Sequence, residues 1–147
     1  VLGVGFAQAD AIAKVASEFP DTKFSIIDVT WLDAPNLRQY GFKEHEGSYL
    51  VGVAAAMASA TGKVGFVGGM DIPLIRRFAC GYVQGVKSVD LNMQVFQNMT
   101  GSTPAAWNDP AKGAELYDLH SSCIEDRLQY RTACKQFYYH SSSTHGQ

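Results

Sequence analysis

The chain has 147 residues and a mass of 16.0 kDa, and 46% of its residues are hydrophobic and 18% charged. This composition is typical of one globular domain and argues against disordered, collagen-like and coiled-coil chains. The formal net charge is -2 and the pI is near 6.1, so the chain lacks the basic field that would draw it onto nucleic acid or an anionic membrane. The longest apolar run, around residues 50–60, is shorter than the roughly 20 residues that span a bilayer, and no transmembrane helix is expected.

The three cysteines and four histidines do not form a metal or redox motif. The cysteines make no CxxC pair, and they form no metal-like cluster with the histidines. We therefore expect neither a metal ion nor a cofactor. Because the chain opens on Val1 inside an apolar run, we interpret it as a fragment, with any signal peptide or lipid-anchor cysteine lost before this point.

The first third of the chain predicts a strand, a helix and two further strands. Residues 1–4 are apolar and lead into a glycine turn, and a helical spacing of apolar residues then continues up to Pro20. The run at residues 24–29 is apolar on both faces, which is typical of a sheet covered by helices on each side. After a loop, residues 38–42 predict another short strand.

The next predicted helix, over residues 46–59, combines a stripe of larger apolar residues with many small ones. The stripe at i, i+3, i+4 and i+7 consists of Leu50, Val53, Ala54 and Met57. The small residues, Gly52 among them, leave little side-chain bulk and would allow a neighbouring sheet or helix to approach closely.

Strands and helices continue to alternate up to residue 116. Residues 63–70 predict the clearest strand, Asp71 and Pro73 then open a helix, and residues 94–99 predict a further strand. Asp109 followed by proline indicates one more helix start. Such alternation predicts an α/β fold with a mostly parallel sheet, whose ligands sit beyond the carboxyl ends of the strands.

The composition changes at residue 117. No valine occurs after that point, and no convincing strand follows the helix that begins near Asp109. We expect residues 117–147 to be a divergent tail, which is either a genuine but unusual extension, disordered at least at its polar end, or the product of a frameshift near Leu116.

The opening turn resembles the start of a dinucleotide-binding motif. Gly3 and Gly5 follow a strand, and Asp28 ends the next strand, where a ribose-binding acid would stand, but Gln8 replaces the third glycine of the motif. The two glycines are equally explained by a tight turn from strand to helix. A Rossmann-like NAD-binding oxidoreductase domain therefore stays as an alternative function.

Two residues near the predicted carboxyl ends of strands are candidate ligand contacts. Asp10 lies in the first turn of the first helix, where its carboxylate can cap the helix or accept N–H bonds from the edge of a purine. Trp107 lies in a polar loop, where its ring can anchor the loop or stack on a flat ligand, a contact worth about 1–3 kcal/mol. The residues alone leave both alternatives open for each side chain.

No part of the sequence presents a catalytic centre. The segment Lys43-Glu44-His45-Glu46 is interpreted as a solvated helix terminus with internal ion pairs and not as an acid–base or metal site, because it holds a single histidine. There is no GxSxG motif and no Cys/His arrangement of catalytic spacing. We therefore predict a binding protein and not an enzyme.

Five sequence blocks resemble the basic membrane protein family, the substrate-binding lipoproteins of bacterial ABC importers that are similar to the purine nucleoside receptor. The blocks follow the family's order: VGFAQADAI (4–12), YGFKEHEGSYLVGVAAAMAS (40–59), TGKVGFVGGMDIPLI (61–75), FACGYVQGVK (78–87) and WNDPAKG (107–113). The chain departs from the family pattern in three ways. The amino-terminal part of the first lobe is absent, the residues TPAA before Trp107 look like an insertion, and nothing after Leu116 matches.

The resemblance implies an incomplete type I periplasmic-binding-protein fold, in which mostly parallel sheets wound with helices form two partial lobes that close on a ligand. Residues 1–61 would be the later part of the first lobe, and residues 62–116 the start of the second.

The resemblance also implies a site for a nucleoside-like ligand. By analogy with the family, Asp10 would bind the edge of the base and Trp107, where the family usually has Phe, would stack on it. Phe6, Met70 and Asn108 are further expected ligand contacts. The family's ribose-binding acid and lysine, and its second stacking aromatic, lie outside the matching part of the chain.

The leading hypothesis is therefore a fragment of the substrate-binding component of an ABC importer, which takes a purine nucleoside or a related small molecule between two lobes. The implied partners are this ligand and the permease subunits in the membrane, and the complete protein is expected to be a monomer. The expected location is the cell envelope, either lipid-anchored on the plasma membrane or periplasmic. A further alternative is a non-functional truncation product.

Overall fold

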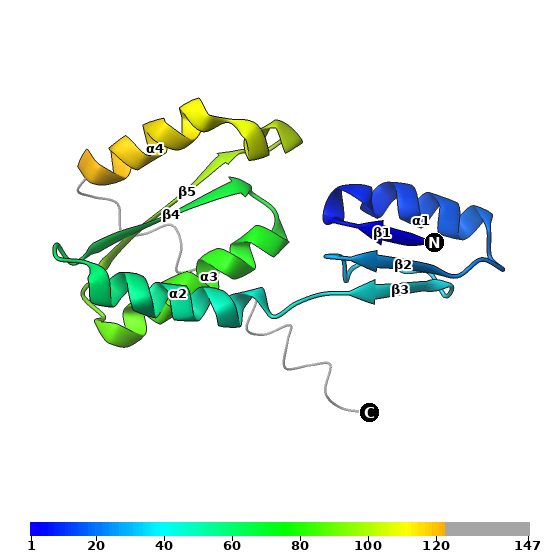
Figure 1. The fold of residues 1–147 in the computed structure, drawn as a ribbon, viewed down its shortest axis with the longest axis horizontal. Coiled ribbons are helices and arrows are strands. Elements are labelled where there is room, and N and C mark those ends of the chain that lie inside the picture. Colours follow the sequence, from blue (N-terminus) through cyan, green and yellow to red (C-terminus); the bar gives the residue numbers. More distant parts are fainter. Residues whose placement is uncertain (123–147) are drawn as a thin grey trace. The chain divides into compact units, whose positions relative to one another are not determined.

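A computed structural model describes residues 1–122, which fall into two compact units, Val1–Lys43 and the part that begins at Glu44 (Figure 1). The boundary between the units lies at the start of helix α2 (Glu44–Ala58), and the division into lobes at residue 61 stays a prediction. Helix α2 belongs to the second unit because it packs along helix α3 (Pro73–Val89). Of the predicted tail, residues 117–147, the first six continue helix α4 (Pro110–Ser122), and residues 123–147 lie outside the described residues.

The first unit is built on a sheet of three parallel strands. Strands β1 (Leu2–Val4), β2 (Phe24–Ile27) and β3 (Leu37–Tyr40) lie in the order β1-β2-β3. Between β1 and β2 the chain forms a 3-10 turn, η1 (Phe6–Gln8), and helix α1 (Ala9–Glu18). The expected strand, helix, strand and strand are thus all present, in the predicted order.

Helix α1 covers one face of this sheet. The buried side chains of the helix and of β2 meet there in a single apolar cluster: Ala9, Ile12, Ala16, Phe24, Ile26 and Val29. On the opposite face Leu2, Ser25, Ile27 and Tyr40 line an open hollow, and no element described in this unit covers them (Figure 1). The sequence predicted cover on both faces, and within the described part of this unit only one face has it.

Asn36 ties the end of α1 to the chain that enters β3. Its buried Nδ2 lies 3.0 Å from the carbonyl oxygens of Ala16, Phe19 and Thr22. An amide nitrogen carries two hydrogens, so it can serve two of these three oxygens at a time. Carbonyls at a helix end have no partner within the helix, and this side chain supplies one.

The second unit has a sheet of two long parallel strands, β4 (Lys63–Met70) and β5 (Gln94–Gly101), joined through α3. Helices α2 and α3 lie on one face of these strands and α4 (Pro110–Ser122) on the other (Figure 1). The turn η2 (Pro104–Asn108) connects β5 to α4. Asp109 begins α4 as predicted, because its Oδ1 accepts the backbone N–H of residue 112 at 2.8 Å.

Helices α2 and α3 approach so closely that glycines are needed at their contact. A Cβ on Gly85 would meet the carbonyl oxygen of Tyr49 across the interface. The buried residues of α2 on this side are Glu44, Ser48, Gly52 and Ala56. Leu50 and Met57, from the predicted apolar stripe, are instead 67% and 76% exposed. The prediction that the larger side chains form the buried face of α2 is therefore wrong for Leu50 and Met57. Only the small residues let the backbones of α2 and α3 come together.

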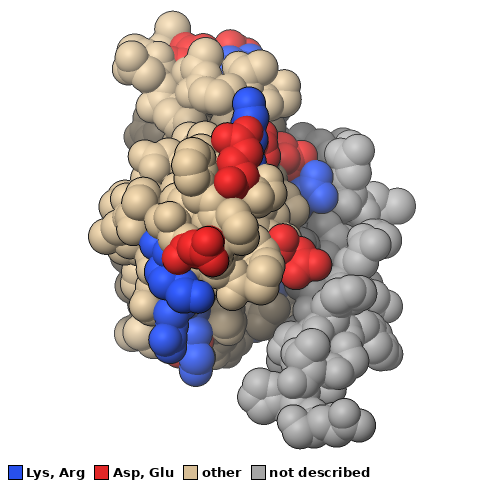
Figure 2. All heavy atoms as spheres, turned by 90° about the vertical axis from the view of Figure 1, so that its right-hand side faces the viewer, with Lys and Arg blue, Asp and Glu red and all other residues tan. Residues whose placement is uncertain are grey.

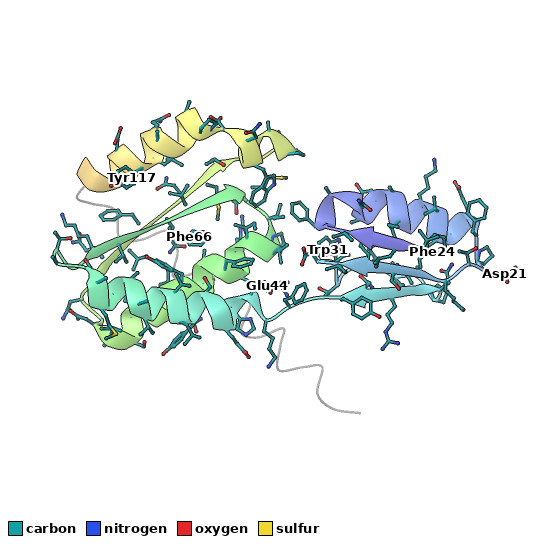
Figure 3. The ribbon with its side chains drawn as sticks, in the orientation of Figure 1. Asp21, Phe24, Trp31, Glu44, Phe66 and Tyr117 are labelled. Carbon is teal, nitrogen blue, oxygen red and sulfur yellow. The ribbon has the colours of Figure 1, made fainter. Side chains whose placement is uncertain are left out.

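Glu44, at the start of α2, is buried beside α3 (Figure 3). Its Oε1 accepts a hydrogen bond from Arg77 Nη2 at 3.2 Å, while Glu44 Oε2 and Arg77 Nε have no partner. The interpretation of this segment as a solvated terminus is thus wrong for Glu44, because α3 covers it. A buried carboxylate with one partner depends strongly on that partner.

We expect Gly85→Ala to lower the free energy of unfolding by about 3 kcal/mol, because the added methyl group meets backbone atoms that cannot rotate away. Gly47→Ala is the matched control in α2, since a Cβ there meets nothing within 4 Å. The control should gain about 0.5–1 kcal/mol from its better helix propensity. Urea denaturation measures both, and equal effects of the two variants would contradict the close packing.

We expect Arg77→Met to cost roughly 3 kcal/mol of stability, because it leaves the carboxylate of Glu44 buried without a cation. The control is Arg76→Met, which removes a cation from Asp71 in a pair whose side chains are both largely exposed. Exposed pairs contribute between about 0 and 1 kcal/mol. Thermal denaturation in which both variants lose the same stability would argue against a special role of the Glu44 pair.

Candidate functional site

The residues predicted to contact a ligand lie after the carboxyl ends of parallel strands in both units. In the first unit Phe6 follows β1 in η1, and Asp10 stands in the first turn of α1. In the second unit Met70 ends β4, and Trp107 and Asn108 lie in η2 after β5. Within each unit the strands are parallel, so these residues gather at the edge where ligands of open α/β sheets bind.

The turn after β1 places Asp10 at this edge. Gly5 has a φ of +90°, which favours glycine, and its N–H donates to the carbonyl oxygen of Ile27 at 3.1 Å. Helix α1 then begins without a side-chain cap, and Asp10 is exposed in its first turn. The side chain of Asp10 makes no hydrogen bond or ion pair with another described residue. Its carboxylate favours the helix through the dipole, and both oxygens stay available as acceptors.

A second carboxylate stands at the same edge of the first unit. Asp28 follows β2 and has a φ of 67°, the left-handed region that few non-glycine residues adopt. Its N–H donates to the carbonyl oxygen of Tyr40 at 2.8 Å, and its side chain has no partner among the described residues. The sequence alone suggests Asp28 only as a ribose-binding acid of an NAD site, and the structure places it beside the turn that precedes Asp10.

Trp31 is an exposed aromatic that the sequence analysis missed. It lies in the loop after β2 and is 54% exposed (Figure 3). The amide of Gln39 holds the next residue of this loop, Leu32, because it donates to its carbonyl oxygen at 2.7 Å and accepts its N–H at 2.9 Å. An aromatic in a polar loop after a strand is the signal that singled out Trp107, and it would have found Trp31 as well.

The indole of Trp107 lies on the backbone of Gly69 in β4. A Cβ on Gly69 would lie 2.5 Å from the ring atoms Cε3 and Cζ3 and 2.8 Å from Cδ2. These nearly equal distances indicate that the ring lies face-on over the glycine. Trp107 is also 47% exposed, so the ring packs on the glycine and stays partly accessible to solvent. This contact supports the loop-anchor alternative for Trp107, and stacking on a ligand stays a prediction.

Asp71 follows β4 and pairs with Arg76 in α3. The guanidinium donates from Nε to Oδ1 at 2.6 Å and from Nη2 to Oδ2 at 2.8 Å. This hydrogen bond holds the pKa of Asp71 below its ordinary value. The sequence predicted that Asp71 opens the helix, but α3 begins at Pro73 and its N-cap residue makes no side-chain cap bond. Asp71 is thus an ionised, paired group and not a base held ready for catalysis.

The described surface also carries a hollow that lies apart from the predicted site residues. The hollow on the uncovered sheet face of the first unit has a volume of about 640 Å³ and contains none of the predicted site residues. Figure 2 shows acidic and basic side chains interspersed over the face in view. Among residues 1–122 no helix combines the length and apolar character needed to cross a membrane. Within the same residues, no group of His, Cys, Asp and Glu could hold a metal ion.

Comparison of the chain with known protein families shows which family it matches. Residues 1–123 match the family described as Bmp, ABC transporter substrate-binding protein PnrA-like. The chain belongs to this family. Its members are substrate-binding proteins and not enzymes, so the alternative of an NAD-dependent oxidoreductase domain is set aside.

Curated relatives of the Bmp family show the same similarity over most of the chain. The "ABC transporter nucleoside-binding protein BmpA" of Lactococcus lactis is 41% identical over 116 residues, 79% of this chain and 32% of that protein. The "CD4+ T-cell-stimulating antigen" of Listeria monocytogenes is 44% identical over 95 residues, 65% of this chain and 27% of that protein. The chain thus spans about a third or less of the length of these relatives.

Solved structures agree on the fold. A solute-binding protein of an ABC transporter system from Aeropyrum pernix has a TM-score of 0.59 and 32% identity, covering 79% of this chain and 36% of that one. A structure described as a transcriptional activator of the comK gene from Bacillus halodurans has a TM-score of 0.62 and 25% identity, covering 80% and 38%. The expected fold, part of a periplasmic-binding-protein-like α/β architecture with parallel sheets, is confirmed.

We expect Asp28→Ala to lower the free energy of unfolding by about 1 kcal/mol, because alanine tolerates a positive φ less well than aspartate. Asp28→Gly should leave stability unchanged or raise it by less than about 1 kcal/mol, since glycine adopts this backbone without strain. Chemical denaturation of the two variants measures the difference. A more stable Ala variant would show that Asp28 does not hold this conformation in solution.

Proposed function

We propose that this chain carries ligand contacts of an ABC-importer substrate-binding protein that takes a purine nucleoside or a related heterocyclic solute. Trp107 supplies a flat surface for the base at the carboxyl edge of β4 and β5. Asp10 supplies acceptors for N–H groups at the rim of the base, as carboxylates do for exocyclic amines. Phe6, Met70 and Asn108 complete the proposed set of contacts.

The observation that carries this proposal is the packing of the Trp107 indole on the backbone of Gly69. An indole that packs on backbone and stays partly exposed is suited to stacking on a planar ligand, and base–aromatic stacking is worth about 1–3 kcal/mol per base. The name of the Lactococcus lactis relative, which states nucleoside binding, supports the same class of ligand.

The proposal also covers the partners and the cellular location of such a protein. The partners would be a small heterocyclic ligand and the permease subunits of the importer, with the complete binding protein acting as a monomer. The protein would work in the cell envelope, either lipid-anchored on the plasma membrane or periplasmic. Nucleic acid is not among the proposed partners, in keeping with a net charge of -2.

Calorimetric titration with guanosine, adenosine and inosine tests the function on a receptor of full family length that carries these residues. Asp10→Ala and Trp107→Ala are each expected to weaken binding at least tenfold, because a tenfold loss corresponds to about 1.4 kcal/mol and each contact is worth that much or more. No heat with any of the three nucleosides would count against the proposed ligand class.

Two control variants remove a carboxylate and an aromatic ring, as the site variants do, but at positions outside the proposed contacts. Asp21→Ala removes an exposed carboxylate from the turn between α1 and β2, at the amino end of the strand (Figure 3). Tyr117→Ala removes an exposed aromatic from α4. Both controls should bind as the unaltered receptor does, and site variants that also bind unchanged would refute the assigned contacts.

A further inference from the structure

We propose that Thr100 is a positioning residue for the ligand surface: its hydroxyl fixes η2 so that Trp107 lies flat on Gly69 before a ligand arrives. This inference rests on the proposed function, because it concerns the same surface. It adds a residue of β5 that makes no ligand contact itself, and the test below separates its failure from that of the proposed function.

The hydroxyl of Thr100 lies near two other segments at the carboxyl edge of the second unit. Thr100 Oγ1 lies 2.7 Å from the carbonyl oxygen of Ala106 in η2 and 3.2 Å from that of Gly69 in β4. A hydroxyl has one proton to donate, and the shorter distance favours Ala106. The bond therefore holds the peptide that leads directly into Trp107.

The end of β5 leaves room for this peptide, because Gly101 has no side chain there. Ala106 is buried, and a Cβ on Gly101 would lie 3.2 Å from the Cβ of Ala106. Ala106 thus packs against the end of β5 while its carbonyl oxygen is held by Thr100. With Ala106 fixed on β5, the next side chain, Trp107, comes to lie over the adjacent strand at Gly69.

Holding the ring in advance matters for binding. A side chain that is already ordered loses less conformational freedom when a ligand stacks on it, so more of the contact energy appears as affinity. Loss of the Thr100 bond is expected to free η2 and to release the indole from Gly69. The effect should be seen in the ring itself, and not only in the stability of the unit.

The test uses the 147-residue chain in a Trp31→Phe background, where Trp107 is the remaining tryptophan. Thr100→Val removes the hydroxyl at nearly constant volume, and Thr100→Ser keeps it. Thr103→Val is the matched control, because Thr103 is exposed at the start of η2 and makes no side-chain cap bond. Near-ultraviolet circular dichroism and acrylamide quenching report on the indole, and inosine serves as the stacking probe.

We expect Thr100→Val to lose most of the near-ultraviolet tryptophan signal and to raise acrylamide quenching at least twofold. Inosine quenching of Trp107 should need at least threefold more nucleoside in this variant. Thr100→Ser should restore all three readouts, and Thr103→Val should match the parent. If Thr100→Val fails to fold, Thr100→Ala removes the same hydroxyl without placing a methyl group there, and the same readouts apply.

The outcomes separate the two proposals. An indole signal that is the same in Thr100→Val and in the parent overturns the positioning role. An altered indole signal with unchanged response to inosine also overturns it, because the ring would then not need to be held for stacking. If the indole signal changes as expected but inosine quenches neither the variant nor the parent, the Thr100 bond is confirmed as the contact that holds the ring, and stacking of inosine on Trp107 in this chain is refuted.

Discussion

Parallel strand direction is the constraint on which the arrangement of this chain depends. β1, β2 and β3 run parallel in the first unit, and β4 and β5 do so in the second. Where a helix crosses back between parallel neighbours, the residues that follow each strand meet at one edge. Phe6, Asp10 and Asp28 therefore share an edge in the first unit, and Met70 and Trp107 share one in the second.

Glycines make the close approaches of the second unit possible, and each does so in a different way. Gly85 lets the backbone of α3 come against the carbonyl oxygens of α2, so that the two helices pack as a pair. Gly69 leaves the place of a side chain to the indole of Trp107. In both positions an added Cβ would occupy space that other atoms already fill. The helix packing and the proposed ligand surface thus both depend on the absence of a side chain in glycine.

The groups at these edges suit binding and not catalysis. The candidate contacts are aromatic rings and carboxylates that act as acceptors. Arg76 lowers the pKa of Asp71 through the hydrogen bond between them, and the raised pKa of Tyr82 follows from burial in the core between the helices and strands. A solute receptor needs shape, stacking and hydrogen bonds without a poised acid or base, and this agrees with membership of the Bmp family.

Much of the fold could be read from local patterns, because those patterns are set by neighbours in the chain. Proline and aspartate at helix starts, as at Asp109, and apolar runs of strand length predicted the elements in their observed order. The same local signals singled out Trp107 as an aromatic in a polar loop after a strand. They also placed Asp10 in the first turn of a helix.

Tertiary packing decided what periodicity could not. The spacing of Leu50 and Met57 matched a buried stripe as well as that of Ser48 and Gly52 did, and only the nearness of α3 buried the small residues. The same packing took Glu44 out of water and assigned α2 to the second unit. A sequence specifies which side chains could face a neighbour, but which neighbour arrives, and how closely, depends on chain segments far apart. For that reason the packing of Trp107 on Gly69 could be found only from the tertiary structure.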